Sequence, residues 1–315
     1  MQKVIIDCDP GHDDLFAIAL ARKFFKILAI TTVAGNSSLK NTTNNALIAV
    51  DLFGLADVPV SPGAAWPLGR SSAEFTDAHG VTGLDGPISR HPRSKPVNKN
   101  AVDVLLDASH AYPGIWIIAI GPLTNIAMAI RMDPGFINRI AGISLMGGSA
   151  TFGNVTAAAE YNVWFDPLAA SEVFSSGVKI KMCGLDLTHQ LLIDLSFAES
   201  LRKFGSDEAI FCSELVEYYH AYSQRLHGRD PVLDSSVGAA LHDPCAVLAL
   251  ARPDLFLSEK LSVVVELEGR YTKGMTLVDK RSWENSKASN VEVMTRIDAK
   301  QARQVIIESF RPEEA

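Results

Sequence analysis

Short runs of consecutive apolar residues alternate along the chain with segments whose apolar residues recur every three or four positions. The apolar runs lie at residues 4–6, 27–36, 58–60, 115–120, 143–146 and 179–185. Runs of this kind are typical of strands buried on both faces of a parallel sheet. Helical spacing begins at residue 13 and returns at residues 41–55, 102–111, 123–127, 166–175, 196–225, 244–251 and 299–310. The alternation predicts an α/β fold with an open, mostly parallel, Rossmann-like sheet and helices on both faces.

Two further strands, at residues 261–268 and 291–297, are expected at an edge of the sheet or in a hairpin, and residues 275–283 fit no single pattern. Residues 61–97 are rich in Pro, Gly and Ser, and residues 227–238 are largely polar, so two long loops are expected there. Loops of this length inside a compact domain are usually functional. No linker interrupts the alternation, and residues 1–315 are expected to form one domain.

The composition is that of a globular protein, and it narrows the classes of partner. Apolar residues make up 47% of the 315 residues, and 29 basic against 36 acidic side chains give a net charge of −7. This balance argues against binding to nucleic acid or to an anionic membrane, but not against a small uncharged substrate. No apolar stretch reaches transmembrane length, and no secretory leader precedes the first strand. The four cysteines are scattered, so a protein of the reducing cytoplasm is expected.

Four aspartates crowd into eight residues where the first strand gives way to the first helix. They are Asp7, Asp9, Asp13 and Asp14. Pro10 and Gly11 lie between them and end the strand, because Pro cannot donate to a strand ladder and Gly allows a sharp turn. Carboxylates this close repel one another, and a hard cation with oxygen ligands relieves the repulsion. The carboxyl end of a parallel strand is also where open α/β sheets bind ligands.

A simpler interpretation is that these aspartates cap the helix and complement its dipole. It accounts for Asp13 or Asp14, which lie in the first helical turn. It does not account for Asp7 and Asp9 on the strand side, where Asp is disfavoured. The cluster as a whole therefore indicates a metal site.

Other polar groups are candidates for a site. His79 lies in the first long loop, where a histidine is either solvated or in contact with a ligand. Glu160, Asn162 and Asp166 sit among apolar and aromatic residues, so they are either hydrogen-bonded in the interior or directed into a cleft. His-Asp at residues 242–243 stands at the start of an apolar helix, where the aspartate could be a plain N-cap or a ligand.

The aspartate cluster is part of a longer motif. DCDPGHDD at residues 7–14 resembles the signature of the inosine–uridine-preferring nucleoside hydrolase family. Five more blocks are similar to those of the family and follow its order: TVAGN at 32–36, GPLTNIA at 121–127, MGG at 146–148, EYN at 160–162 and HDP at 242–244. The resemblance spans nearly the whole chain. It implies the nucleoside hydrolase fold and a calcium-dependent N-ribohydrolase that acts on nucleosides and forms homodimers or homotetramers.

The resemblance also implies roles for single residues. Ca²⁺ would be bound by the carboxylates of Asp9, Asp14 and Asp243 and by the backbone carbonyl of Ile120. Asp9, which would also face a water of the calcium shell, would be the general base, and His242 would donate a proton to the departing nucleobase. The residues implied around the substrate are Asp13, Asn36, Met146, Asn154, Glu160 and Asn162, with His79 as a further candidate.

The chemistry of N-glycosidic cleavage suits these residue types. The sugar gains positive charge in the transition state, and the oxygens of Glu160 and Asn162 would stabilise that charge. Calcium would orient the ribose diol and lower the pKa of its bound water. Asp7 resembles a supporting residue behind the metal.

The loop around His79 and residues 223–238 are less similar to the family, and in relatives these regions contact the nucleobase. Candidates for that contact are Gln224, His227, Arg229 and Asp230. The choice between purine and pyrimidine therefore stays open. His242 makes the chain resemble the branch of the family with a histidine near the leaving group.

Two alternatives remain. An Asp-x-Asp at a strand end also opens haloacid-dehalogenase-type phosphatases, which use Mg²⁺, but that pattern has Thr or Val shortly after the second Asp, where Pro10 and Gly11 stand here. The other alternative is a nucleoside- or ribose-binding protein without turnover, against which the presence of Asp9 and His242 argues.

Overall fold

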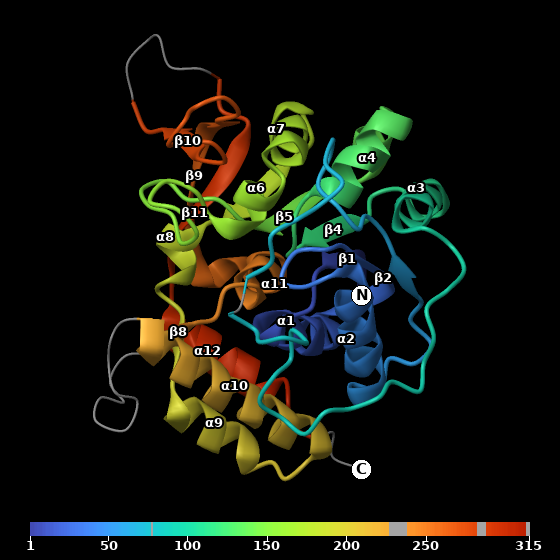
Figure 1. Cartoon of the computed structure of the whole chain (residues 1–315), viewed down its shortest axis with the longest axis vertical. Helices are drawn as coiled ribbons and strands as arrows, with labels where there is room; N and C mark the ends of the chain where they lie inside the picture. Colours follow the sequence, from blue (N-terminus) through green and yellow to red (C-terminus); the bar gives the residue numbers. More distant parts are fainter. Residues whose placement is uncertain (77, 227–237, 282–287, 313–315) are drawn as a thin grey trace.

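A sheet of nine strands runs through the molecule, with helices on both faces (Figure 1). The computed structural model describes residues 1–76, 78–226, 238–281 and 288–312. In spatial order the strands are β10 (Thr276–Asp279), β9 (Phe256–Val265), β11 (Val291–Ile297), β6 (Ile180–Cys183), β5 (Gly142–Met146), β4 (Trp116–Ala119), β1 (Gln2–Cys8), β2 (Phe25–Thr32) and β3 (Val60–Pro62). The strands from β11 to β3 are parallel, which confirms the predicted open, mostly parallel sheet.

The sheet ends in an antiparallel edge, but the outermost strand there is β10, and the two strands expected at an edge or in a hairpin, β9 and β11, lie second and third from the edge. β9 is antiparallel to β11, and β10 is antiparallel to β9. β10 lies within residues 275–283, which the sequence pattern left unassigned. At the opposite edge, β3 begins two residues later than predicted. Pro59 has no N–H to donate, and its carbonyl accepts a hydrogen bond from the Ile30 N–H at 2.9 Å, so regular pairing starts only at Val60.

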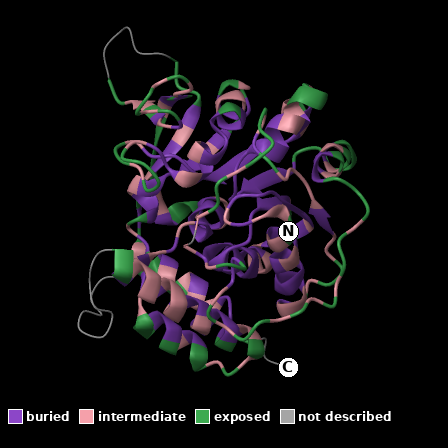
Figure 2. Ribbon diagram, in the orientation of Figure 1, coloured by how far each residue is buried: buried purple, intermediate pink, exposed green. Residues whose placement is uncertain are grey.

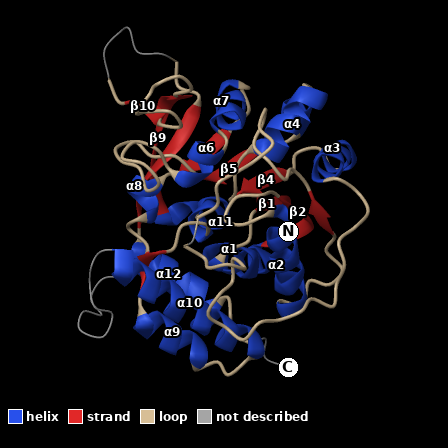
Figure 3. Cartoon of the chain, viewed as in Figure 1, coloured by secondary structure: helices blue, strands red, loops and turns tan. Residues whose placement is uncertain are grey.

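The helices form two layers, one on each face of the sheet (Figure 3). The first layer contains α1 (His12–Phe24), α2 (Leu39–Leu52), α9 (Leu195–Arg202), α10 (Asp207–Leu226), α11 (Pro244–Ala251) and α12 (Ala299–Glu308). The second contains α3 (Ala101–Ala111), α4 (Thr124–Met132), α5 (Phe136–Arg139) and α7 (Pro167–Ser175). Residues 196–225, predicted as helical throughout, divide between α9 and α10. No helix in the described part of the chain has the length and apolar character that crossing a membrane requires.

Two hydrophobic cores lie on opposite faces of the sheet, and β1 contributes to both. Val4 and Ile6 belong to the core that contains α1 and α11, whereas Ile5 belongs to the core that contains α3 and α4. Successive side chains of a strand point to opposite faces, which explains this division. Figure 2 shows the buried residues concentrated in the sheet and in the adjoining faces of the helices.

The crossovers of the chain leave a crevice beside β1. From β1 the chain passes through α1 to β2 on one side, and it returns through α3 to β4 on the other side. The loops after β1 and β4 therefore diverge, and such a switch point is where open α/β sheets bind ligands. Short elements complete the surroundings: α6 (Tyr161–Phe165), α8 (Leu185–Thr188), and a ribbon of β7 (Leu192–Ile193) and β8 (Ala239–Ala240).

The end of the described chain is anchored in the first core by an aromatic cluster. Phe310 is fully buried, with its ring centroid 5.6 Å from that of Phe16 and 6.3 Å from that of Phe53. We expect Phe310→Ala to lower the free energy of unfolding by about 3–5 kcal/mol, because it leaves a cavity in a packed core. Urea denaturation measures the difference.

A matched control is Leu257→Ala on β9, since Leu257 is 60% exposed. The control is expected to stay within about 0.5 kcal/mol of the parent protein. A loss of less than about 1 kcal/mol for Phe310→Ala would contradict the packing of this segment.

Candidate active site

The loop between β1 and α1 is held in shape by one of its own carboxylates. The Asp14 side chain accepts hydrogen bonds from the backbone N–H of Gly11 at 2.8 Å and of Asp9 at 3.3 Å. Asn36, from the loop after β2, donates from Nδ2 to the Asp9 carbonyl at 3.2 Å and to Asp14 Oδ2 at 3.3 Å. The two loops are therefore joined at the carboxyl ends of adjacent strands.

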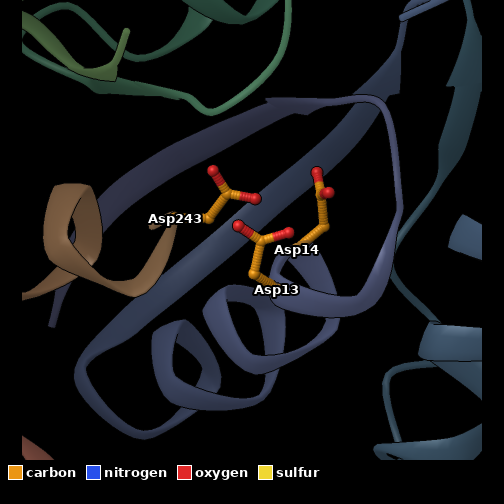
Figure 4. Close-up of side chains that lie close together, drawn as sticks. All are labelled: Asp13, Asp14 and Asp243. Carbon is orange, nitrogen blue, oxygen red and sulfur yellow. The ribbon is translucent and has the colours of Figure 1, made fainter. Parts of the chain in front are cut away.

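Three carboxylates converge in the crevice: those of Asp13, Asp14 and Asp243 offer oxygens within 4.8 Å of one another (Figure 4). All three side chains are buried. Burial, together with the charge of Asp13, raises the pKa of Asp14 to about 7 and that of Asp243 well above its ordinary value. Asp243 is the N-cap residue of α11 but makes no capping hydrogen bond with its side chain. The plain N-cap interpretation therefore does not account for Asp243, and a divalent cation fits this set of oxygens.

Asp9 was predicted as a ligand alongside Asp14 and Asp243, whereas the three-carboxylate group contains Asp13 in its place. Its Oδ2 atom accepts a hydrogen bond from the Asn36 N–H at 2.7 Å, and its Oδ1 atom is buried without a hydrogen-bond partner in the described residues. A Cβ atom at Gly35 would collide with Oδ2, and one at Gly121 would lie 2.6 Å from Oδ1. Burial, and next the charge of Asp14, raises the pKa of Asp9 well above its ordinary value.

The other predicted ligand, the carbonyl of Ile120, lies just beyond β4. It accepts a hydrogen bond from Asn162 Nδ2 at 3.3 Å, and the same Nδ2 atom donates to the carbonyl of Met146 at 3.2 Å. The structure thus brings Ile120, Met146 and Asn162 together. Whether Ile120 binds a metal stays a prediction.

The buried Glu160 carboxylate is held by backbone N–H groups on both sides of the loop before α6. It accepts hydrogen bonds from the N–H groups of Gly148 at 2.8 Å, Asn162 at 2.9 Å and Val163 at 3.2 Å, and it caps α6. Burial raises its pKa to about 7. Asn154 lies close by, with its Oδ1 atom accepting from the Tyr161 N–H at 2.9 Å.

Two of the polar residues are structural. Asp166 caps α7 and accepts hydrogen bonds at 2.8 Å from the Leu68 N–H and from the Thr124 hydroxyl, so it joins the first long loop to α4. Asp7 accepts from the Thr31 hydroxyl at 2.6 Å and from Asn125 Nδ2 at 2.8 Å. The supporting position that the resemblance implied for Asp7 agrees with these contacts.

His79 is buried rather than solvated, with only 6% of its surface exposed. Its Nδ1 atom lies 2.8 Å from Nδ1 of His12, whose Nε2 atom is 2.8 Å from the carbonyl of Asp85. The ring of His79 also stacks on Tyr219 with centroids 5.6 Å apart, and that of His12 stacks on Tyr218 at 5.1 Å. Sequence reasoning missed His12 and both tyrosines. The position of His12 inside the aspartate motif was the available signal, whereas α10 gave none.

A cavity of about 610 Å³ opens between the His79 loop and α10. Phe75 and Asp85 line it from the loop, and Tyr218, Tyr222 and Arg225 line it from the helix. The loop is fastened to the crevice by Asn45 Nδ2, which donates at 2.9 Å to the carbonyls of both Pro10 and Thr82. Of the loop residues proposed to contact the base, Gln224 is buried in α10, whereas His227, Arg229 and Asp230 lie outside the described residues.

His242 precedes Asp243 on the approach to α11. Its Nδ1 atom lies 2.8 Å from the hydroxyl of Thr188, and its ring centroid is 5.6 Å from that of His189. Burial lowers the pKa of His242 to about 4. Its ring is therefore neutral near pH 7. The role toward the departing base that the resemblance implied for His242 stays a prediction.

Known proteins with similar sequences are ribonucleoside hydrolases. The chain matches the family model for inosine-uridine preferring nucleoside hydrolases over residues 4–304. It is 40% identical over 298 residues to the pyrimidine-specific ribonucleoside hydrolase RihA of Shewanella woodyi, covering 94% of this chain and 93% of that protein. It is 38% identical over 299 residues to RihA of Escherichia coli K12, covering 94% of each.

Solved structures with similar folds carry the same activity in their names. A plant nucleoside hydrolase, PpNRh1, superposes with a TM-score of 0.90 at 32% identity, and the match covers 98% of each chain. The purine-preferring ribonucleoside hydrolase from Gardnerella vaginalis superposes with a TM-score of 0.90 at 30% identity, again over 98% of each chain.

These similarities support neither the phosphatase nor the binding-protein alternative. They extend over the elements that carry the crevice, from the aspartate motif after β1 to the His-Asp pair before α11. The chain belongs to the inosine-uridine preferring nucleoside hydrolase family and is a ribonucleoside hydrolase, an enzyme that cleaves the N-glycosidic bond between ribose and nucleobase.

Proposed function

We propose that this enzyme binds Ca²⁺ in the crevice beside β1 and hydrolyses pyrimidine ribonucleosides to ribose and free base. The main support for a bound metal ion is the state of Asp9 Oδ1. This atom is buried without a hydrogen-bond partner in the described residues, close to three further buried carboxylates. A buried carboxylate oxygen without a partner is costly unless a cation or a ligand compensates it.

The proposed ligands are the carboxylates of Asp9, Asp14 and Asp243 and the carbonyl of Ile120. Asp13 faces the same space, because its carboxylate lies within 4.8 Å of those of Asp14 and Asp243. We assign Asp13 to a ribose hydroxyl, as the resemblance to the family implies. Ca²⁺ suits this set because it accepts many oxygen ligands in flexible geometry.

The side chains around the crevice have different proposed roles in cleavage of the N-glycosidic bond. Bound calcium would orient the ribose diol and lower the pKa of a water in its shell. Asp9 takes the proton of the attacking water as general base. The Nδ2 atom of Asn162 donates to two backbone carbonyls, and its Oδ1 atom has no hydrogen-bond partner within the described residues, so it would stabilise the positive sugar together with the Glu160 carboxylate. His242 assists the departing base.

The proposed remaining sugar contacts are Asn36, Met146 and Asn154, and His79 is proposed to contact the substrate on the side of the cavity. The aromatic rings of Phe75, Tyr218 and Tyr222 line that cavity and could stack on a nucleobase. The preference for pyrimidines is supported by the relatives of about 40% identity, which are named pyrimidine-specific. The relative named purine-preferring is more distant, at 30% identity.

We further propose that residues 1–315 act as one domain and assemble as a homodimer or homotetramer in the cytoplasm. One sheet contains strands that extend from residue 2 to residue 297, which supports a single domain. The four cysteines are buried and free, which agrees with a reducing compartment. Light scattering and cell fractionation test the assembly and the location.

Metal removal tests the proposed function directly. We expect the enzyme to release ribose from uridine and cytidine at least about tenfold faster than from inosine or adenosine, in terms of kcat/KM. Excess chelator should abolish release from every nucleoside, and Ca²⁺ should restore it better than Mg²⁺ because Mg²⁺ demands strict octahedral geometry. Activity that survives exhaustive chelation would refute the requirement for a metal ion. Cleavage of inosine faster than of uridine would refute the preference for pyrimidines.

Asp9→Asn tests the general base. The substitution keeps an oxygen for the Asn36 N–H but removes the basic group, so kcat should fall by about 10²–10⁴-fold while the thermal midpoint is retained. Ribose release and circular dichroism measure the two effects. A variant that keeps more than about a tenth of the parent kcat would show that another group takes the proton.

Gly35→Ala tests whether the position of Asp9 sets metal affinity. The added methyl group would collide with the Asp9 carboxylate, so Ca²⁺ affinity measured by calorimetry should fall by at least about tenfold. Gly54→Ala is the matched control, because Gly54 has φ 69° and open space around it. The control should lose about 1 kcal/mol of stability and keep its Ca²⁺ affinity. Equal affinities for both variants would argue against Asp9 as a ligand.

A further inference from the structure

The hydroxyl of the buried Thr188 contacts the ring of His242. Thr188 is the last residue of α8 and is fully buried. Its backbone is held by the turn, because its N–H donates to the Gly184 carbonyl at 3.0 Å and its carbonyl accepts from the Leu191 N–H at 3.0 Å. The Oγ1 atom lies 2.8 Å from Nδ1 of His242, and this is its only hydrogen-bond contact in the described part of the chain.

Counting protons decides the direction of this hydrogen bond. A threonine hydroxyl carries one hydrogen, and a buried hydrogen without an acceptor is unfavourable. Among the described residues, the only acceptor in contact with Thr188 Oγ1 is Nδ1 of His242, which favours a bond in which the hydroxyl donates and Nδ1 accepts. If Nδ1 carried a proton, the hydroxyl hydrogen of Thr188 would have no acceptor. The contact therefore disfavours both the Nδ1–H tautomer and the imidazolium form.

The remaining proton of the neutral ring must then be on Nε2. This atom has no hydrogen-bond partner within the described residues, and the ring stands next to Asp243 of the acidic cluster. An Nε2–H group in that position is available to a ligand in the crevice.

We propose that Thr188 is a positioning residue that fixes His242 in the Nε2–H tautomer, so that the neutral ring donates a hydrogen bond to the departing nucleobase. As the C1′–N bond breaks, its electron pair moves onto the base, and the Nε2–H stabilises the negative charge that the base acquires. The proton stays on Nε2 during cleavage, and no imidazolate is formed. The anionic base takes up a proton from solvent on release, and Asp9 returns to solvent the proton that it took from the attacking water. This inference rests on the proposed function in one respect: the leaving-group role of His242.

The tautomer can be observed without reference to activity. The calcium-loaded enzyme, labelled with ¹⁵N at histidine, is studied by two-bond ¹H–¹⁵N correlation spectra, with His242→Gln used to assign the signals. We expect Nδ1 of His242 to have the shift of an unprotonated ring nitrogen and Nε2 that of a protonated one. In Thr188→Val the two shifts should move toward an average, and in Thr188→Ser they should return. A protonated Nδ1 in the parent enzyme would overturn the inference without any variant.

Kinetics test the consequence. With uridine, Thr188→Val should lower kcat by about tenfold, with KM nearly unchanged, because a misoriented Nε2–H weakens only transition-state stabilisation. With a p-nitrophenyl riboside, whose leaving group needs no assistance, kcat should change by less than about twofold. Thr188→Ser should behave as the parent enzyme. Equal losses on both substrates would indicate a merely structural role and overturn the proposal.

His242→Ala separates the two levels of the argument. A selective loss on uridine together with a protonated Nδ1 in the parent enzyme would refute the role of Thr188 alone. An equal loss on uridine and on the p-nitrophenyl riboside would refute the leaving-group role of His242, and with it the function assigned to the Thr188 hydrogen bond, even where the spectra show the expected tautomer.

Discussion

Repulsion among buried carboxylates is the main constraint on this active site. Asp9, Asp13, Asp14 and Asp243 are all buried beside one crevice, although nearby negative charges and the loss of water both disfavour ionisation. A protein retains such an arrangement only when a cation or protons compensate it. The surrounding loops keep the carboxylates together by hydrogen bonds rather than by opposite charges, since Asp14 and Asp9 accept from backbone N–H groups. The site is thereby ready for a metal ion before the ion arrives.

The strand order of the sheet determines where the carboxylate cluster lies, and two glycines leave space for the Asp9 side chain. The switch in strand order beside β1 brings the ends of β1, β2 and β4 to one crevice. Gly35 and Gly121 follow β2 and β4 and stand against the two oxygens of Asp9, where any side chain would collide. A carboxylate enclosed by backbone on both sides has one orientation, which is the preorganisation that catalysis by charge requires.

The opposite side of the site is built from imidazole rings in apolar surroundings. His79 packs with His12 on the tyrosines of α10, and His242 rests on Thr188. Burial lowers the pKa of His12 to about 3 and those of His79 and His242 to about 4, so these rings add no positive charge near pH 7 that would oppose binding of a cation to the acidic cluster. Under the proposed function, the acidic region would bind the sugar and the neutral, hydrogen-bonding region would bind the base.

Local patterns in the sequence were sufficient to predict the sheet and most of its helices and to identify the motif blocks, because strand and helix periods depend on neighbouring residues. Contacts between residues far apart in the chain were not accessible in this way. Burial of His79 depends on its contact with His12, 67 positions earlier in the chain, and on the hydrogen bond from Asn45 to Thr82, which are 37 positions apart. Asp166 likewise links two segments that are distant in the sequence. Two further features depend on how loops meet after folding, which the periodicity of the sequence does not encode. One is the group of three converging carboxylates, which contains Asp13 rather than Asp9. The other is the hydrogen bond between Thr188 and His242.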